Sequence, residues 1–150
     1  MRSIAAASLF LLASIGLAAA QPMVAGPCLD VKQPQPVRLE GVLTRKVFPG
    51  PPNYQDIRKG DMPEPAYILR LSRPVCVAGD MFADRMQRID RVQIFPADAD
   101  TGNQPLWADL RRLVGRPVIV EGREPFGAHT GHHHAPLLLP VTRISRARAR

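Results

Sequence analysis

Apolar and polar residues alternate in several short segments of this chain, and this pattern predicts β-strands. In residues 37–45, Leu39 and Leu43 fall on one face while Arg38 falls on the other. Further segments of this kind are residues 67–71, 91–95, 117–123 and 137–145, and residues 74–77 continue the second strand or flank it after a break. Pro140 places the last strand at an edge or a bulge, because proline cannot donate a hydrogen bond to a neighbouring strand.

One segment between these strands has helical spacing instead. Pro105 suits the first turn of a helix, and Gly115 and Pro117 end it. The apolar residues that share one helical face are Leu106, Trp107, Leu110, Leu113 and Val114. The sequence therefore predicts one helix between the third and the fourth strand.

Three strands, a helix and two further strands is the element order of an OB fold, a five-stranded Greek-key barrel. Residues 37–41 and 118–122 share the pattern valine, any residue, an aliphatic residue, glutamate and glycine. In such a barrel the first and fourth strands are neighbours that coil sharply, and glycine permits the bend and the close approach. We therefore expect an all-β domain with one helix, built as a small OB-like barrel; an SH3-like barrel and a small sandwich are the alternatives.

The composition agrees with a small β domain. The chain has 16 prolines and 11 glycines in 150 residues, which argues against a helical bundle. Apolar residues make up 45% and charged residues 22%, which argues against disorder over the whole chain. Prolines and glycines are dense in residues 48–65, so we expect a long, turn-rich connection between the first two strands.

The first 20 residues are typical of a secretory signal peptide. Arg2 provides a positive end, an apolar run follows from Ile4, and three alanines precede the expected cleavage before Gln21. A membrane anchor is the alternative, but the apolar run is interrupted by polar residues and glycine, and no basic stop follows. The expected organisation is a signal peptide at 1–20, a proline-rich lead-in at 21–36, the barrel domain at 37–146 and a basic tail at 147–150. We expect a periplasmic or secreted protein with no stable membrane insertion after cleavage.

Export bears on the two cysteines, Cys28 and Cys76. Compartments outside the cytoplasm oxidise thiols, and two cysteines allow one pairing. We therefore predict a disulfide between Cys28 and Cys76; two buried free thiols are the alternative.

All four histidines fall within six residues and are His129, His132, His133 and His134. Neutral imidazoles bind zinc, copper or nickel, and two or three converging rings make a site. The cluster lies between the last two strands, in a loop that OB folds use for ligands. The alternative is structural, because neighbouring histidines also cap turns and stack on aromatic rings such as Phe126. The four histidines are our candidate metal ligands.

Several short motifs resemble those of a known family. They are the segment from Gly50 to Tyr54, Gly60–Asp61, the segment from Pro74 to Cys76, and Thr130 to His134 followed by Pro136. With these motifs the chain resembles an exported bacterial family catalogued as domain of unknown function 4431. Ala135 stands where members of that family often have threonine, so a hydroxyl contact is not expected there. The resemblance implies export and a compact β domain and leaves the function open.

The positive charge of the C-terminal tail is typical of a solvated end that keeps a protein soluble, and attraction to anionic lipid or cell-wall polymer is the alternative. The formal net charge is +7, which becomes +6 without Arg2, and most of the basic residues are arginines, which suit carboxylate and phosphate. We expect a binding module whose ligand surface is the histidine loop flanked by Arg123, Asn53 and Tyr54. Its ligand is a transition metal, an anionic glycan or lipid of the envelope, or another envelope protein.

Other function classes have less support from the residues. A metal-assisted hydrolase needs a general base, for which Glu121 and Glu124 are nearest in sequence, but no H-E-x-x-H or G-x-S-x-G motif is present. No catalytic constellation is visible, so we do not expect an enzyme. An OB domain that binds oligonucleotides or other polyanions would use exposed aromatics over a basic groove, but export argues against nucleic acid. An inhibitor of a basic cell-wall hydrolase would be repelled by its partner.

Overall fold

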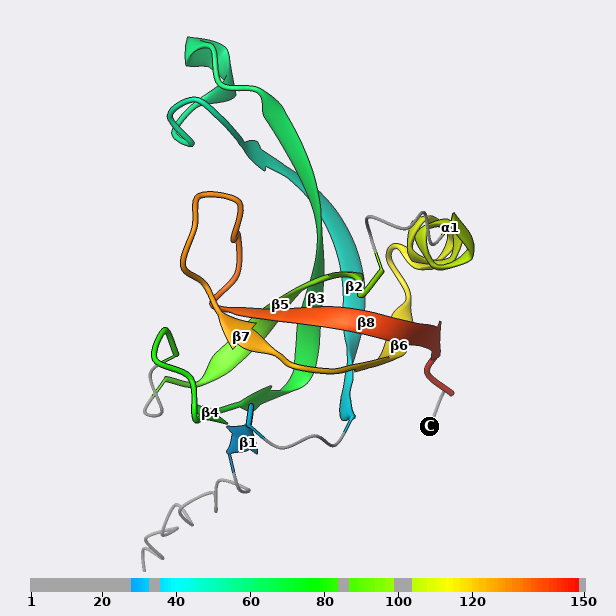
Figure 1. Cartoon of the computed structure of the whole chain (residues 1–150). Helices are drawn as coiled ribbons and strands as arrows, with labels where there is room; N and C mark the ends of the chain where they lie inside the picture. The colour runs from blue at the N-terminus through cyan, green and yellow to red at the C-terminus, as the bar shows by residue number, and fades with distance from the viewer. Residues whose placement is uncertain (1–27, 33–35, 84–86, 99–103, 149–150) are drawn as a thin grey trace, which may run out of the picture.

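The computed structural model describes residues 28–32, 36–83, 87–98 and 104–148 (Figure 1). The expected signal peptide lies outside the described residues, as do most of the lead-in and the last two residues of the tail. Within the described residues, no helix is long and apolar enough to cross a membrane.

The strands of the main sheet are β2 (Val37–Pro49), β3 (Pro63–Val75), β5 (Ile89–Pro96), β6 (Pro117–Gly122), β7 (Phe126–Gly127) and β8 (Leu137–Arg146). A separate pair of short strands is β1 (Leu29–Asp30) and β4 (Val77–Ala78). The helices are the short 3-10 helix η1 (Ile57–Lys59) and the α-helix α1 (Gln104–Leu113).

The five long strands close into an OB-like barrel. Neighbours follow the order β5, β3, β2, β6, β8, and parallel pairing of β5 with β8 closes the circle. The α-helix lies between β5 and β6, which are the third and fourth long strands. The structure therefore confirms the expected fold class, and the short strands β1, β4 and β7 are additions to it.

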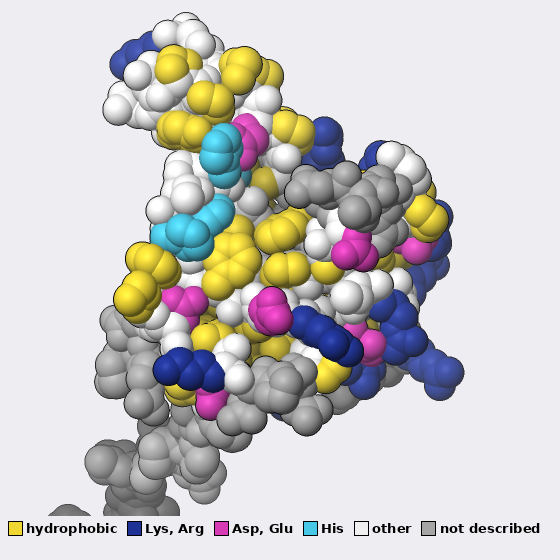
Figure 2. Space-filling view, viewed as in Figure 1, with side chains coloured by type: hydrophobic (Ala, Val, Ile, Leu, Met, Phe, Trp, Pro, Cys, Tyr) yellow, Lys and Arg dark blue, Asp and Glu magenta, His cyan; other side chains and the backbone are white. Residues whose placement is uncertain are grey.

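The first two long strands extend well beyond their predicted bounds. Their pairing continues from Gly41 opposite Leu71 as far as Pro49 opposite Pro63, so the ends of the expected connection at 48–65 are strand. The prolines are tolerated because they lie at the end of a two-stranded ribbon. The hairpin rises from the barrel as a separate lobe (Figures 1 and 2).

The barrel interior is apolar and α1 covers one end of it. The helix buries Leu106, Leu110 and Leu113 against the core, whereas Val114 lies just past the helix and is 39% exposed. The expectation that Val114 belongs to the buried face is wrong, because the helix has ended at Leu113. The fully buried side chains of the strands include Leu43, Leu69, Ile89, Ile94, Val92, Val118, Leu137 and Leu139.

The two matching glycine motifs lie side by side. Val37 of β2 pairs with Gly122 of β6, and Gly41 pairs with Val118, in an antiparallel ladder. A Cβ atom on Gly41 would collide with the carbonyl of Arg70, and one on Gly122 with the carbonyl of Pro140. Both glycines are therefore needed for close backbone approach, as the sequence pattern predicts.

The last strand, β8, contains Pro140 beside a β-bulge. Glu121 of β6 pairs with Arg143 of β8, whereas Gly122 pairs with Val141, so β8 has one extra residue between these pairs. Pro140 lies next to this bulge, where a missing N–H donor is tolerated.

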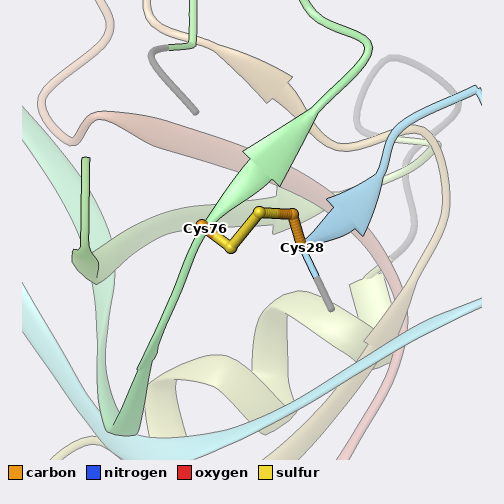
Figure 3. Close-up of a disulfide and its surroundings, with 2 residues drawn as sticks. All are labelled: Cys28 and Cys76. Atoms are coloured by element: carbon orange, nitrogen blue, oxygen red, sulfur yellow. A yellow bond between two sulfur atoms is a disulfide. The ribbon is translucent and has the colours of Figure 1, made fainter. Parts of the chain in front are cut away.

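The predicted disulfide between Cys28 and Cys76 is present (Figure 3). The bridge joins residues 48 positions apart, with Cα atoms at 4.6 Å. Beside it β1 runs parallel to β4, and the N–H of Leu29 donates to the carbonyl of Cys76 at 2.9 Å. The bridge thus ties the segment that precedes the barrel to the end of β3, and a loop of this length implies roughly 4 kcal/mol of chain-entropy stabilisation.

Replacing either close-approach glycine is expected to destabilise the barrel. Gly41→Ala or Gly122→Ala should lower the free energy of unfolding by about 2 kcal/mol or more, because backbone must move to admit the methyl group. Glu40→Ala, an exposed position on the same strand, should change it by less than about 0.5 kcal/mol. Denaturant titration measures all three, and equal values for the glycine variants and the control would contradict the close approach.

Candidate functional site at the junction of two loops

Two loops rise from the same end of the barrel (Figure 1). The β2–β3 loop (residues 50–62) tops the hairpin, and the histidine loop (residues 128–136) connects β7 to β8. OB barrels use the loops in these two places to hold ligands. The side chains at this loop junction are Tyr54, Glu64, His132 and His134.

A buried carboxylate fixes the β2–β3 loop. Asp61 is 4% exposed, and its oxygens accept backbone N–H groups of Asn53 at 2.9 Å, Gln55 at 2.7 Å and Asp56 at 2.8 Å. These hydrogen bonds, led by that of Gln55, hold the pKa of Asp61 below its ordinary value of 3.8, although burial opposes the shift. The carboxylate therefore acts as an anion inside a ring of backbone donors and sets the loop conformation.

Tyr54 is held in an unusual conformation by this loop. Its φ of 57° lies in the left-handed region, which is uncommon for a residue with a side chain. Its N–H donates to the carbonyl of Gly50 at 2.9 Å. Its ring lies against Gly131, where a Cβ atom would come within 2.9 Å of the ring carbons. Glycine at position 131 thus allows the two loops to touch.

Glu64, near the start of β3, connects the hairpin to the histidine loop. Its Oε2 is 2.8 Å from Nδ1 of His132, and its Oε1 is 3.1 Å from Nε2 of His134. An ionised carboxylate accepts hydrogen bonds only, so both histidine nitrogens donate. In a neutral ring of His132 the other nitrogen, Nε2, then accepts, and the hydroxyl of Tyr54 donates to it at 2.9 Å.

The histidine loop is also attached to the barrel wall. The side-chain amide of Gln93 in β5 donates to the carbonyl of His132 at 3.1 Å and accepts the N–H of His134 at 2.6 Å. The ring of His134 stacks on Phe48 with centroids 4.2 Å apart, and its side chain is 8% exposed. Ala135 packs in a small apolar cluster with Phe48 and residues of β3. The loop is therefore a fixed part of the surface.

The other two histidines form a separate group. The rings of His129 and His133 meet edge to face at 4.5 Å, and both contact Phe126. The Nδ1 of His133 accepts the N–H of His129 at 3.0 Å, and the ring of His129 stacks on Phe82 at 4.8 Å. These contacts are the turn-capping and ring-stacking roles that formed the structural alternative.

His133 is held towards its neutral form. Burial lowers its pKa below 6.5, and the charges of the three other histidines lower it further. Because the unfolded chain then binds a proton more readily than the folded one, protonation of His133 opposes folding as the pH falls below 6.5.

The four candidate metal ligands are thus divided into two pairs. Figure 2 shows histidine side chains in two separate areas, one of them beside an acidic side chain. Within the part of the chain that the structure describes, no group of three or more His, Cys, Asp or Glu side chains is arranged to hold a metal ion. The structure does not bring His129, His132, His133 and His134 to one point.

The remaining predicted site residues have other roles. Asn53 contributes its backbone N–H to the Asp61 ring. Arg123 is exposed, and its backbone N–H donates to the carbonyl of Pro140. Glu121 is one of the carboxylates considered as a base. It accepts hydrogen bonds from two nitrogens of Arg143 at 2.7 and 3.1 Å, and these hydrogen bonds lower the pKa of Glu121. Glu124 is exposed, with a left-handed φ of 52°.

Sequence reasoning missed Glu64 and Gln93. Glu64 alternates with Ala66 and Ile68, which would have placed all three on one face of a strand. The flanking prolines at 63 and 65 concealed this strand. Nothing in the sequence near Gln93 indicates that its amide holds a distant loop.

A groove lies between the hairpin and α1. It has a volume of about 420 Å³, and its lining residues are Arg45, Pro65, Tyr67, Trp107, Arg111 and Val114. The rings of Tyr67 and Trp107 are tilted, with centroids 6.1 Å apart. Among the described residues, neither Arg45 nor Arg111 forms an ion pair. We call this the arginine groove.

Replacing the loop carboxylate should loosen the β2–β3 loop. Asp61→Asn is expected to speed amide hydrogen exchange at Gln55 and Asp56 several-fold, because an amide oxygen is a weaker acceptor than a carboxylate. Folding lowers the pKa of Asp61, so the ionised carboxylate stabilises the folded protein. This stabilisation should be complete above pH 3.8 and should be lost as the pH falls through the pKa of Asp61 in the folded protein.

Asp109→Asn serves as the control, because Asp109 pairs with Arg112 on the exposed side of α1. In this variant the amides of Gln55 and Asp56 should exchange as they do in the parent protein. Unchanged exchange in Asp61→Asn as well would show that the loop conformation is set by something other than this carboxylate.

Residues 91–145 match the model of a family described as Domain of unknown function (DUF4431). The matched segment runs from within β5 through α1, β6 and β7 to the last but one residue of β8, and it includes the whole histidine loop. Comparisons with curated proteins and with solved structures found no match. Over this segment the chain resembles the family that the sequence motifs indicate.

Proposed function

We propose that this protein is an exported binding module that holds an acidic glycan in the arginine groove. The observation that carries the proposal is one groove that combines two aromatic rings with two guanidinium groups that form no ion pair with any described residue. The expected signal peptide and the disulfide support a location outside the cytoplasm. The proposal transfers the expected anionic ligand from the histidine loop to a neighbouring face of the hairpin.

The chemistry of the groove suits a carboxylated sugar. Arg45 on β2 and Arg111 on α1 are both exposed, and a guanidinium group binds a carboxylate through two parallel hydrogen bonds. Trp107 is half-buried and offers an apolar ring surface beside them. The volume of about 420 Å³ falls in the ordinary range for small-ligand pockets.

Charge separates this groove from another cleft of the described surface. A cleft of about 510 Å³ near the disulfide end includes exposed Met81 and Phe82, but Asp80 and Glu124 line it too. Carboxylates at that cleft would repel an acidic ligand. The arginine groove and the net charge, which is +6 without Arg2, both attract one.

The role of the loop junction in this proposal is to hold one wall of the groove. Pro65, Tyr67 and Arg45 belong to the hairpin, and the hairpin is linked to the histidine loop through Glu64. A fixed wall lowers the entropic cost of ordering the site when the ligand binds.

Trp107 is the one tryptophan of the chain, so its fluorescence reports on the groove directly. Titration with an oligogalacturonide should change this emission, and the fully methyl-esterified oligomer, which has the same rings without charge, should bind much more weakly. Arg45→Gln and Arg111→Gln should each weaken binding about tenfold, and added salt should weaken it in the parent protein.

Arg112→Gln is the matched control, because Arg112 lies on the same helix but pairs with Asp109. Equal affinity for the charged and esterified oligomers would contradict the proposal. So would binding that is unaffected by Arg45→Gln and Arg111→Gln. Tighter binding of a single-stranded oligonucleotide than of the acidic oligosaccharide would favour the polyanion alternative instead.

A further inference from the structure

Three side chains of the loop junction form a continuous hydrogen-bonded chain. The carboxylate of Glu64 accepts Nδ1–H of His132, and Nε2 of the same ring accepts the hydroxyl of Tyr54, at 2.8 and 2.9 Å. A carboxylate that orients an imidazole, which in turn accepts a proton from a hydroxyl, is the arrangement that activates oxygen nucleophiles in enzymes. No catalytic constellation was expected from the sequence, because its members lie on two separate loops and a strand.

Each member of the chain is held by its own contacts. Tyr54 follows Asn53 in the loop that Asp61 fixes. The backbone of His132 is held by Gln93. The second oxygen of Glu64 is occupied by His134. Catalytic groups that are fixed before the reaction need little rearrangement during it, and this is the condition for an efficient base.

The reactive atoms are also accessible. The side chain of His132 is 56% exposed, and Tyr54 is half-buried at the loop surface. Tyr67, which is the second of the two tyrosines in the chain, is 7% exposed. The protein thus contains one tyrosine with a histidine acceptor at the surface and one that is almost fully buried, at the wall of the arginine groove.

We propose that the hydroxyl oxygen of Tyr54 is a nucleophile that takes the acyl group of a carboxylic ester. The oxygen attacks the ester carbonyl carbon while its proton passes to Nε2 of His132. The bond between the carbonyl carbon and the alcohol oxygen then breaks, and His132 returns the proton to the departing alcohol. The products are O-acylated Tyr54 and a free alcohol, with no oxidation or reduction. This activity uses none of the residues that line the arginine groove, so it is tested separately from glycan binding.

The test uses the full chain and p-nitrophenyl acetate. Release of p-nitrophenol measures the reaction, and peptide mass spectrometry locates the acetyl group on Tyr54 or Tyr67. Tyr54 should be acetylated about a hundredfold faster than N-acetyltyrosinamide under the same conditions, in line with general-base catalysis. Tyr67 is an internal control and should stay unmodified. A rate at Tyr54 equal to that of the free tyrosine derivative would overturn the proposal.

Variants assign the roles. His132→Gln should reduce the rate at Tyr54 to that of the free derivative. Glu64 acts as a positioning residue, so Glu64→Gln should lose most of the acceleration, whereas Glu64→Asp, which keeps the charge, should retain more of it. Lys59→Gln, at an exposed position of the same loop, should react as the parent does.

Tyr54→Phe separates this proposal from direct reaction of the imidazole. It keeps the ring against Gly131 and removes only the oxygen. It should abolish both the stable acetyl adduct on this loop and the matching release of p-nitrophenol. If p-nitrophenol is released as fast from Tyr54→Phe as from the parent, a group other than Tyr54 is the nucleophile and the proposal is wrong. Where a variant does not fold, the acetylation rates of Tyr54 and Tyr67 in the parent protein still test whether Tyr54 is the nucleophile.

Discussion

The barrel closes because neighbouring backbones approach β2 and β6 closely at two positions that have no side chain. Gly41 and Gly122 admit the neighbouring carbonyls of Arg70 and Pro140, so the strands coil far enough for β5 to reach β8. That closure brings the histidine loop, which enters β8, next to Gln93 of β5 and to the hairpin. The loop junction and one wall of the arginine groove both depend on this arrangement.

At the loop junction the carboxylate of Glu64 connects the histidine loop to the β2–β3 hairpin. Glu64 accepts a hydrogen bond from each of two histidines, and one of those rings continues the chain to Tyr54. The four histidines are therefore held in two different ways: one pair is hydrogen-bonded to a carboxylate and the other packs against aromatic rings. The same contacts that fix the loops also give a tyrosine oxygen a proton acceptor.

The fold was largely predictable because it depends on local patterns. Strand alternation, the helix between Pro105 and Gly115 and the repeated glutamate–glycine motif are all local in sequence, and each corresponds to an element of the barrel. The site was not predictable in the same way. His132 and Tyr54 are readily noticed, but Glu64 and Gln93 become their partners only through pairings between distant strands. The arginine groove likewise joins β2 to α1, and no spacing along the chain indicates that contact.

The protonation pattern of His132 tests the central claim most directly. Long-range nitrogen–proton correlation by NMR, at a pH above the range in which histidine titrates, identifies which ring nitrogen carries the proton. The hydrogen-bonded chain predicts the Nδ1–H form for His132, with that proton protected from exchange, and the Nε2–H form for His134. The Nε2–H form for His132, which is the more stable one for free imidazole side chains, would contradict both the link through Glu64 and the role of His132 as acceptor from Tyr54.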